Sequence, residues 1–413
     1  MKKLFAILIV VALAFSAIFV LAACNNNKSD VEKAIEAAQK MSLEDLEKAA
    51  KKELEDNPNL TFNADSLTSG VEKALNAFKA KYEWADGRVK YNSKKGATYQ
   101  PVLTAAMDAN QYVADFVMIQ DASFVDSLVR QGFLLSYTPS GDGITIADAD
   151  KTPQVGVTFN KVFMFNKVRK DADYLKNVWQ LTGKNGKTLK GREVVSFQDP
   201  LAEDINMSFL VMLTSPESVQ KLTAAYKSYF GEDYDGSKDD YPNIGYKFVE
   251  EFLKNRINHA SDTTQAKALA TSEYKDADKI SFIGMAKIKD YQGVSANHKT
   301  EGHEDYYGTA IGAAGWNVEV EGLSGFTYNM WTLIPSTARL PYTACLFVRY
   351  ILSEEGFKAG FDNLGYYSAN TNISAATGDN TLAQWKQVTL GENIPFLRTD
   401  RFAVRQFVGG ILG

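Results

Sequence analysis

Cysteine is scarce in this chain, with only Cys24 and Cys345 among 413 residues. If Cys24 is modified, Cys345 has no partner. The fold then cannot depend on an intramolecular disulfide, although an oxidising compartment would permit one. Cys345 lies in the apolar stretch 344–348. We therefore expect its thiol to act as a small buried hydrophobic group.

Excess positive charge is also lacking. The formal net charge is −5 at pH 7, and loss of Lys2 and Lys3 with a cleaved leader would bring it to −7. Nucleic-acid binding needs concentrated lysine and arginine, so this composition argues against that class of partner. The length of 413 residues exceeds the roughly 250–300 residues that one hydrophobic core supports, which predicts two lobes.

Catalytic motifs are missing as well. Among the three histidines, only His303 precedes a carboxylate, and the second histidine of a zinc-protease helix is absent. Residues 322–325 lack the spacing of a nucleophile elbow, and the glycines at 308, 312 and 315 do not form a dinucleotide loop. We predict that the chain is not an enzyme and uses no cofactor. An exported enzyme and a surface adhesin are the alternatives.

One acidic and aromatic segment contains potential metal ligands. Residues 302–307 combine His303 with two carboxylates and two tyrosines, whose donor atoms suit a hard or borderline ion. Side chains that are adjacent in sequence rarely converge on one ion, and the segment is polar and flanked by glycine like an exposed loop. We predict no metal site.

The most specific signal is at the N-terminus. Lys2 and Lys3 precede an unbroken apolar run over residues 4–23, as in a secretory leader. The run ends in Leu-Ala-Ala directly before Cys24, which resembles the lipobox of bacterial lipoproteins. That resemblance implies cleavage after residue 23 and a thioether-linked lipid on Cys24. An uncleaved anchor is the alternative, since about 20 apolar residues span a bilayer. Both place the remainder outside the cytoplasm.

Residues 24–58 are predicted to form the lipidated cysteine, a polar spacer and a helix over 30–56. Apolar residues recur at helical spacing in both halves of this helix. Ser42, with Asp45 three residues later, predicts that the helix restarts there. The Asn-Pro-Asn sequence at 57–59 ends it.

Strands alternating with helices follow, which predicts a parallel sheet covered on both faces. Ligands of such sheets sit beyond the carboxyl ends of the strands, and the polar loops 63–70 and 120–123 lie at that edge. The predicted strands cover 60–62, 88–92 and 113–119, and the predicted helices cover 71–82, 101–109 and 124–130.

Residues 155–166 alternate as a strand that could cross into a second lobe, and 326–334 predict a return strand. We predict one lobe over 59–158 plus part of 326–413, and the other over 159–325. Residues 179–191 are rich in glycine and lysine, which predicts an exposed segment. Further predicted elements are strands at 193–197 and 280–285 and helices at 217–230, 246–255 and 342–352.

Four segments of the chain resemble the extracellular solute-binding proteins of ABC importers, in the type 2 periplasmic-binding-protein group. The nearest subgroup contains binders of ferric iron, phosphonate, thiamine and polyamines. The resemblance implies two Rossmann-like α/β lobes joined by crossing strands, with a small solute in the cleft between them. The first loop lacks the histidine that iron-binding members often offer, and their late tyrosine pair has no secure position here. The segments are 46–53 running into 60–62, 114–121, 132–139 and 347–357.

The first group of candidate ligand-binding residues follows the first predicted strand. The hydroxyls of Ser66, Thr68 and Ser69, with free N–H groups at a helix start, suit an anionic group of a ligand. Simple helix capping is the alternative for the same residues.

The second group comes from later segments. Gln120, Asp121 and Ser123 pose the same choice between ligand and cap, and Asp121 would also suit a cationic or hydroxylated ligand. Asp199 ends a predicted strand of the second lobe. Trp331 lies in the return strand, where an aromatic ring either stacks on a sugar or cation or packs in the core.

The predicted function is therefore that of a solute-binding lipoprotein that delivers a small molecule to an ABC-importer permease. We expect a monomer that touches the membrane only through its lipid anchor at the outer face. The sequence does not decide whether the solute is a metal ion, an organic anion, a polyamine or a sugar.

Overall fold

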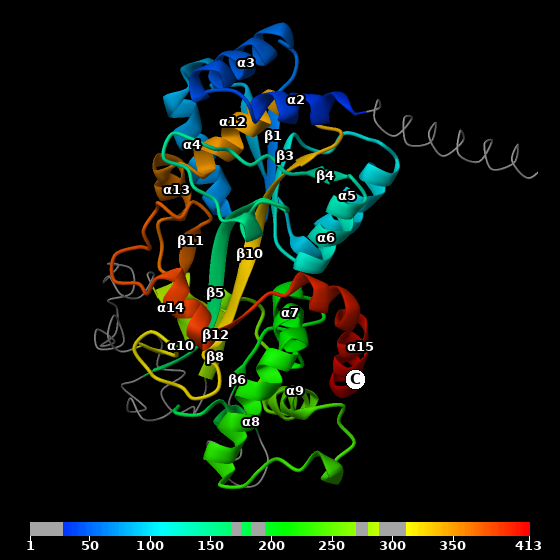
Figure 1. Ribbon diagram of the computed structural model, residues 1–413, viewed down its shortest axis with the longest axis vertical. Coiled ribbons are helices and arrows are strands. Elements are labelled where there is room, and N and C mark those ends of the chain that lie inside the picture. The colour runs from blue at the N-terminus through cyan, green and yellow to red at the C-terminus, as the bar shows by residue number, and fades with distance from the viewer. Residues whose placement is uncertain (1–27, 167–174, 183–194, 270–279, 289–310) are drawn as a thin grey trace, which may run out of the picture.

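The computed structural model describes residues 28–166, 175–182, 195–269, 280–288 and 311–413 (Figure 1). The predicted leader, Cys24 and the 302–307 segment lie outside these ranges. Within them, no helix combines the length and the apolar composition that a membrane span requires.

Two helices precede the first sheet, α2 (Asp30–Ala38) and α3 (Leu43–Asp56). The break between them falls where it was predicted, because the Ser42 hydroxyl accepts the N–H of Asp45 at 3.1 Å and caps α3. Glu53 ties α3 to α12 (Pro341–Ile351) by accepting the N–H of Thr343 at 2.8 Å. The pair is thus docked on the body of the protein.

The upper lobe in Figure 1 contains three parallel strands in the order β2-β1-β3. The predicted loop 63–70 is wrong in its first half, because β1 continues to Ser66. Its polar side chains find tertiary partners: Asp65 accepts from Asn92 at 2.8 Å and pairs with Lys94 at 3.2 Å. The elements are β1 (Phe62–Ser66), α4 (Ser69–Lys81), η1 (Glu83–Ala85), β2 (Val89–Ser93), α5 (Gly96–Asp108), β3 (Phe116–Ile119), α6 (Ala122–Arg130), β4 (Leu134–Leu135) and η2 (Asp148–Asp150).

The lower lobe repeats this plan with parallel strands in the order β8-β6-β7. Trp179 was predicted in an exposed segment but is only 1% exposed, and its indole N–H donates to the Leu222 carbonyl at 2.9 Å. Helix α7 was not predicted, because its continuous apolar run shows no helical stripe. The elements are η3 (Val178–Leu181), β6 (Val195–Ser196), α7 (Asp204–Leu213), α8 (Pro216–Phe230), η4 (Gly236–Lys238), α9 (Ile244–Lys254), β7 (Arg256–Ile257), α10 (Asp262–Leu269), β8 (Ile280–Gly284) and η6 (Met285–Ile288).

Two long antiparallel strands, β5 (Val155–Asn166) and β10 (Gly325–Pro335), run through both lobes (Figure 1). In the upper lobe β10 pairs antiparallel with β3, and in the lower lobe β5 pairs antiparallel with β8. Both crossing strands were predicted, and the lobe boundaries at 158 and 325 stay a prediction. Four short strands flank them in the described residues, namely β9 (Ile311–Ala313) and β11 (Tyr366–Ser368) on β5, and β4 and β12 (Thr389–Gly391) on β10.

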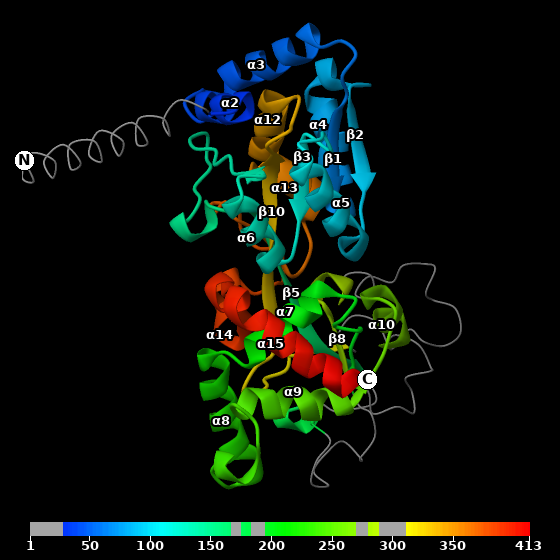
Figure 2. The same ribbon diagram turned by 90° about the vertical axis from the view of Figure 1, so that its right-hand side faces the viewer.

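The C-terminal segment adds three helices, α13 (Glu354–Phe361), α14 (Leu382–Val388) and α15 (Ile394–Leu412). Figure 2 shows α15 lying across the molecule below α6 and beside α7 and α9. Its buried side chains Leu397, Val404 and Val408 face the body of the protein. Helix α15 was not predicted, yet it contacts both lobes.

Candidate ligand-binding site between the lobes

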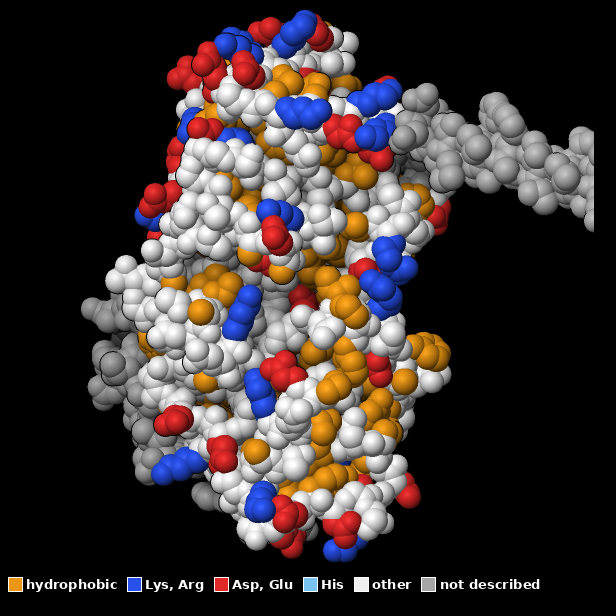
Figure 3. All heavy atoms as spheres, in the orientation of Figure 1, with side chains coloured by type: hydrophobic (Ala, Val, Ile, Leu, Met, Phe, Trp, Pro, Cys, Tyr) orange, Lys and Arg blue, Asp and Glu red, His pale blue; other side chains and the backbone are white. Residues whose placement is uncertain are grey.

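Polar side chains from both lobes meet where the strands of each lobe end. The Gln100 amide, on α5, donates to Asp121 at 3.2 Å and to Asp204, at the start of α7, at 3.1 Å. Figure 3 shows a hollow at this level, with an acidic side chain inside it. The cavity has a volume of about 550 Å³ and is lined by Gln100, Asp121, Ser123, Phe124, Leu201, Ala202, Asp204, Arg401 and Arg405.

Arg401 of α15 is the central cation of this cavity. One guanidinium nitrogen lies 3.1 Å from Asp121 and 2.9 Å from Asp204, and the other donates to the Ser208 hydroxyl at 2.9 Å. The Arg401 side chain is 15% exposed and that of Asp121 is 4% exposed. A paired and largely desolvated guanidinium thus connects carboxylates of different lobes.

Asp121 combines this ion pair with a helix cap. Its carboxylate accepts the N–H groups of Ser123 at 3.1 Å and Phe124 at 3.4 Å, at the start of α6. Burial raises the pKa of Asp121, while Arg401 opposes this effect and Asp204 adds to it. Ser123 lines the cavity, and its hydroxyl is buried without a hydrogen-bond partner among the described residues.

A second set of polar contacts lies near the crossing strands β5 and β10. The Gln120 amide is 3.4 Å from the Glu203 carboxylate across the lobes. Burial raises the pKa of Glu203, and the positive charge of Lys161 opposes the rise. The Lys161 ammonium, on β5, lies 3.1 Å from Asp262 and 3.1 Å from Asn206.

The three candidates at the end of β1 make contacts within the upper lobe. The buried Ser66 hydroxyl donates to the Met118 carbonyl at 3.0 Å and accepts the Thr68 N–H at 3.2 Å. The Thr68 hydroxyl caps α4 by accepting the Gly70 N–H at 3.2 Å, and Ser69 is exposed. None of the three lines the 550 Å³ cavity.

The two remaining candidates also lie away from the lining of this cavity. The Asp199 carboxylate accepts the Leu201 N–H at 2.9 Å, which shapes the turn that leads to α7. Trp331 is 1% exposed and packs in the core, in keeping with the alternative given for it. The structure therefore brings together Gln120, Asp121 and Ser123, and the ligand role of all eight candidates stays a prediction.

Among the lining residues that were not predicted from the sequence, Gln100, Asp204 and Arg401 make the contacts between the lobes. Gln100 lies one residue before the predicted start of its helix, and Asp204 begins the unpredicted α7. A signal for α15 was present: Asn393 caps it by accepting the Phe396 N–H, and Pro395 occupies its first turn. Reading that cap would have placed Arg401 on a helix.

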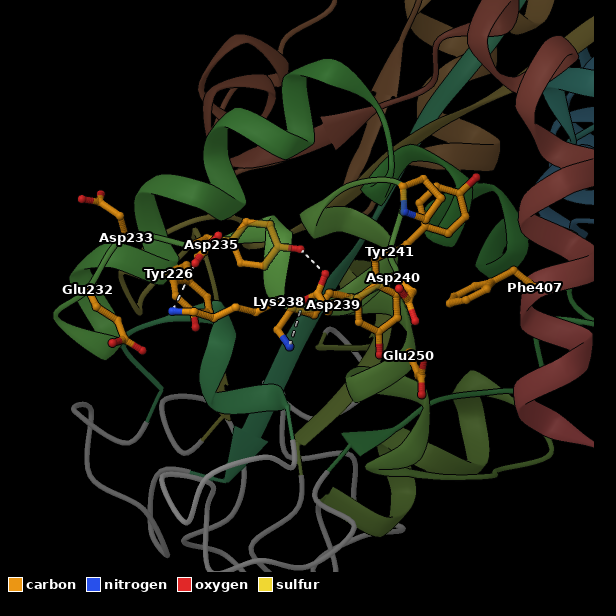
Figure 4. A pocket seen from close by; sticks show the side chains of 14 residues that line it. Tyr226, Glu232, Asp233, Asp235, Lys238, Asp239, Asp240, Tyr241, Glu250 and Phe407 are labelled. Atoms are coloured by element: carbon orange, nitrogen blue, oxygen red, sulfur yellow. Dashed lines mark hydrogen bonds and ion pairs between the residues drawn. The ribbon is translucent and has the colours of Figure 1, made fainter.

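A larger cavity of about 700 Å³ lies within the lower lobe, between α8, α9 and α15 (Figure 4). Tyrosines and carboxylates line it, and their polar groups pair with one another. The Tyr234 hydroxyl donates to Asp239 at 2.8 Å, and Lys247 lies 3.7 Å from Asp239 and 2.9 Å from Glu251. None of the predicted site residues lines this cavity, and only the smaller one draws on both lobes.

The repeated strand order, the two crossing strands and the cavity between the lobes define the type 2 periplasmic-binding-protein fold. The order runs β2-β1-β3-β10-β5 in the upper lobe and β7-β6-β8-β5-β10 in the lower one. This is the predicted fold class, with one α/β layer arrangement built twice around the same pair of strands.

Solved structures with the same fold are numerous, whereas no family model matches the chain and no curated protein matches its sequence. A ferric binding protein from Campylobacter jejuni superposes with a TM-score of 0.58 at 13% identity, over 85% of this chain and 99% of that one. Iron-bound HitA from Pseudomonas aeruginosa gives 0.56 at 14% identity, over 85% and 99%. The PBP AgtB from A. tumefaciens R10, in complex with agropinic acid, gives 0.53 at 14% identity, over 86% and 99%.

Proposed function

We propose that this chain is an extracellular solute-binding lipoprotein that captures a small solute between its lobes for an ABC importer. The supporting observation is a cavity lined by both lobes, on a fold whose solved neighbours include proteins bound to iron and to agropinic acid. A ligand that touches both lobes stabilises the closed form by its higher affinity for that form. The closed form would then dock on the permease, and the chain itself would do no chemistry.

The lining suggests how the roles are divided. Gln120, Asp121 and Ser123 would contact the solute from the upper lobe, as predicted. Gln100 and Asp204 are added from the structure, since their side chains meet across the lobes at 3.1 Å. Asp199 would act by shaping the turn before α7.

Anchoring completes the proposal. Residues 1–23 would be removed, and a lipid on Cys24 would hold the protein at the outer face of the membrane as a monomer. Helix α2 begins at Asp30, so the sequence leaves only a short spacer between Cys24 and this helix. Fatty-acid labelling should be lost in Cys24→Ser, and unchanged labelling would contradict the anchor.

Native mass spectrometry of protein purified without refolding tests the function directly. We expect the mass of one co-purified small molecule, and solution scattering with that molecule should show a smaller radius than the emptied protein. If Asp121→Ala binds the molecule like the parent and its saturation leaves the radius unchanged, the cleft and its closing are misassigned.

A further inference from the structure

Resting on the proposed function, we propose that the solute is a small organic cation with a protonated amine, bound beside the crossing strands. We name the site the hinge cluster. It contains carboxylates from the lower lobe and the C-terminal segment, together with aromatic rings from β5, β10 and β11. Its members are Glu203, Asp262, Glu392, Tyr328, Phe159 and Tyr366.

Negative charge exceeds positive charge around the hinge cluster. Lys161 compensates two carboxylates, since its ammonium lies 3.1 Å from Asp262 and its positive charge also opposes the rise in the pKa of Glu203. Arg401 is already paired with Asp121 and Asp204, and its positive charge also lowers the pKa of Glu392. The exposed Arg405 lies at the rim of the 550 Å³ cavity, 3.4 Å from a backbone carbonyl. Five carboxylates therefore share two buried cations: Asp121, Glu203, Asp204, Asp262 and Glu392 against Lys161 and Arg401.

Tyr328 is an independent observation that points to a ligand. Its side chain lies on β10 and is 8% exposed, yet its hydroxyl makes no hydrogen bond to any residue that the structure describes. The charges of Asp262, Glu203 and Glu392 all act on this hydroxyl and, with burial as the larger cause, raise its pKa. A neutral phenol oxygen among carboxylates is an acceptor for an ammonium N–H group.

Glu392 is a second polar group of the cluster. One carboxylate oxygen accepts the Asn329 N–H at 2.9 Å, and the other makes no hydrogen bond of ordinary geometry among the described residues. Burial raises the pKa of Glu392 to about 8 and the negative charge of Asp121 contributes, while the Ala122 N–H also acts on the carboxylate and lowers its pKa. An ammonium group beside it would compensate the carboxylate charge in place of a proton.

The aromatic rings give the cluster a wall that fits an organic molecule. Phe159 stacks on Tyr366 with centroids 4.1 Å apart and planes at 21°, and Tyr328 meets Phe159 edge-on at 5.8 Å. Ring faces attract ammonium groups and also cover the carbon body of a ligand. An anionic ligand would instead need a free cation, and both Lys161 and Arg401 already have carboxylate partners.

Calorimetric titration of the exported protein, emptied of ligand, tests the sign of the charge. The probes are 1,4-diaminobutane, choline and 4-aminobutanol as amines, with succinate, butyrate and ferric citrate as acidic or metal counterparts. We expect at least one amine to bind and to shrink the scattering radius, and we expect no binding of the acids. Glu392→Gln and Tyr328→Phe should each weaken the binding of that amine at least tenfold, with unchanged circular dichroism.

The outcomes separate this inference from the proposed function. Binding of an acid or of ferric citrate, with no amine bound, overturns the cation inference and leaves solute capture standing. Failure of every probe overturns the cation inference, and solute capture is overturned as well only if no small molecule co-purifies with the protein. The matched control is Glu250→Gln, a carboxylate of the 700 Å³ cavity in the lower lobe, which should bind the amine like the parent. If Glu250→Gln weakens binding and Glu392→Gln does not, the hinge cluster is the wrong site.

Discussion

Two polar segments of the upper lobe look alike in sequence but act differently in the fold. Residues 66–69 begin at the last residue of β1, and residues 120–123 follow β3. The polar groups of the first segment have their hydrogen-bond partners within the upper lobe, since the Ser66 hydroxyl donates to the Met118 carbonyl on the neighbouring strand at 3.0 Å. The second segment has a partner outside the sheet of its lobe, since the Asp121 carboxylate pairs with Arg401 of α15 at 3.1 Å. Polar residues after a buried strand thus indicate an edge of the sheet, and the partners opposite decide their role.

Burial separates the two segments further. Ser66 is fully buried against backbone groups, which are neutral acceptors and donors. Asp121 is buried against a guanidinium and a second carboxylate, so its charge matters as much as its hydrogen bonds. Changes at the second segment should therefore alter both stability and binding, whereas changes at the first should alter stability alone.

The largest effect is expected from removing the cation that the second segment uses. Arg401→Ala leaves Asp121 and Asp204 buried without their partner, which should lower the free energy of unfolding by about 3–5 kcal/mol in urea denaturation. The matched control is Arg405→Ala on the same helix, which is exposed and should change stability by less than about 0.5 kcal/mol. Equal midpoints for the two variants would show that the bridge between lobes contributes nothing.

A paired substitution at Asp121 separates its cap from its charge. The residue has a φ of +79°, which asparagine tolerates better than alanine, and asparagine also caps helices well. Asp121→Ala should therefore lose about 2–3 kcal/mol of stability, and Asp121→Asn about 1 kcal/mol. Both remove the charge and should weaken solute binding about tenfold to a hundredfold in calorimetry. If Asp121→Asn binds the solute with the affinity of the parent, the Asp121 charge plays no part in binding and the residue acts only as a helix cap.

The smallest effect is expected at the first segment. Ser66→Ala removes the hydrogen bonds to Met118 and Thr68, which should cost about 1–2 kcal/mol in thermal or urea unfolding and leave solute affinity unchanged. The exposed Ser69→Ala is its control and should match the parent in both measurements. If Ser66→Ala binds the solute more weakly while its stability equals that of the parent, this segment contacts the solute after all.

Local pattern predicted most of the fold. The alternating residues of β5 gave its bounds, Val155–Asn166, and a cap gave the start of α3 at Ser42. Prediction failed where local pattern is uninformative. Helix α7 is apolar all round, and β1 contains polar residues that become buried only when Asn92 and Lys94 meet Asp65. Three of the eight candidate residues, Gln120, Asp121 and Ser123, lie at contacts between lobes or line the cavity there.

The sequence by itself determined the alternation of strands and helices and the two crossing strands, which follow from periodicity and caps among residues a few positions apart. The class of fold was predicted from the resemblance of four segments to solute-binding proteins. Only the tertiary structure decided which polar side chains meet. Gln100 and Asp204 are 104 residues apart, and Arg401 and Asp204 are 197 apart. Charges at such separations acquire partners only when the packed chain brings them within about 3 Å and removes the water between them.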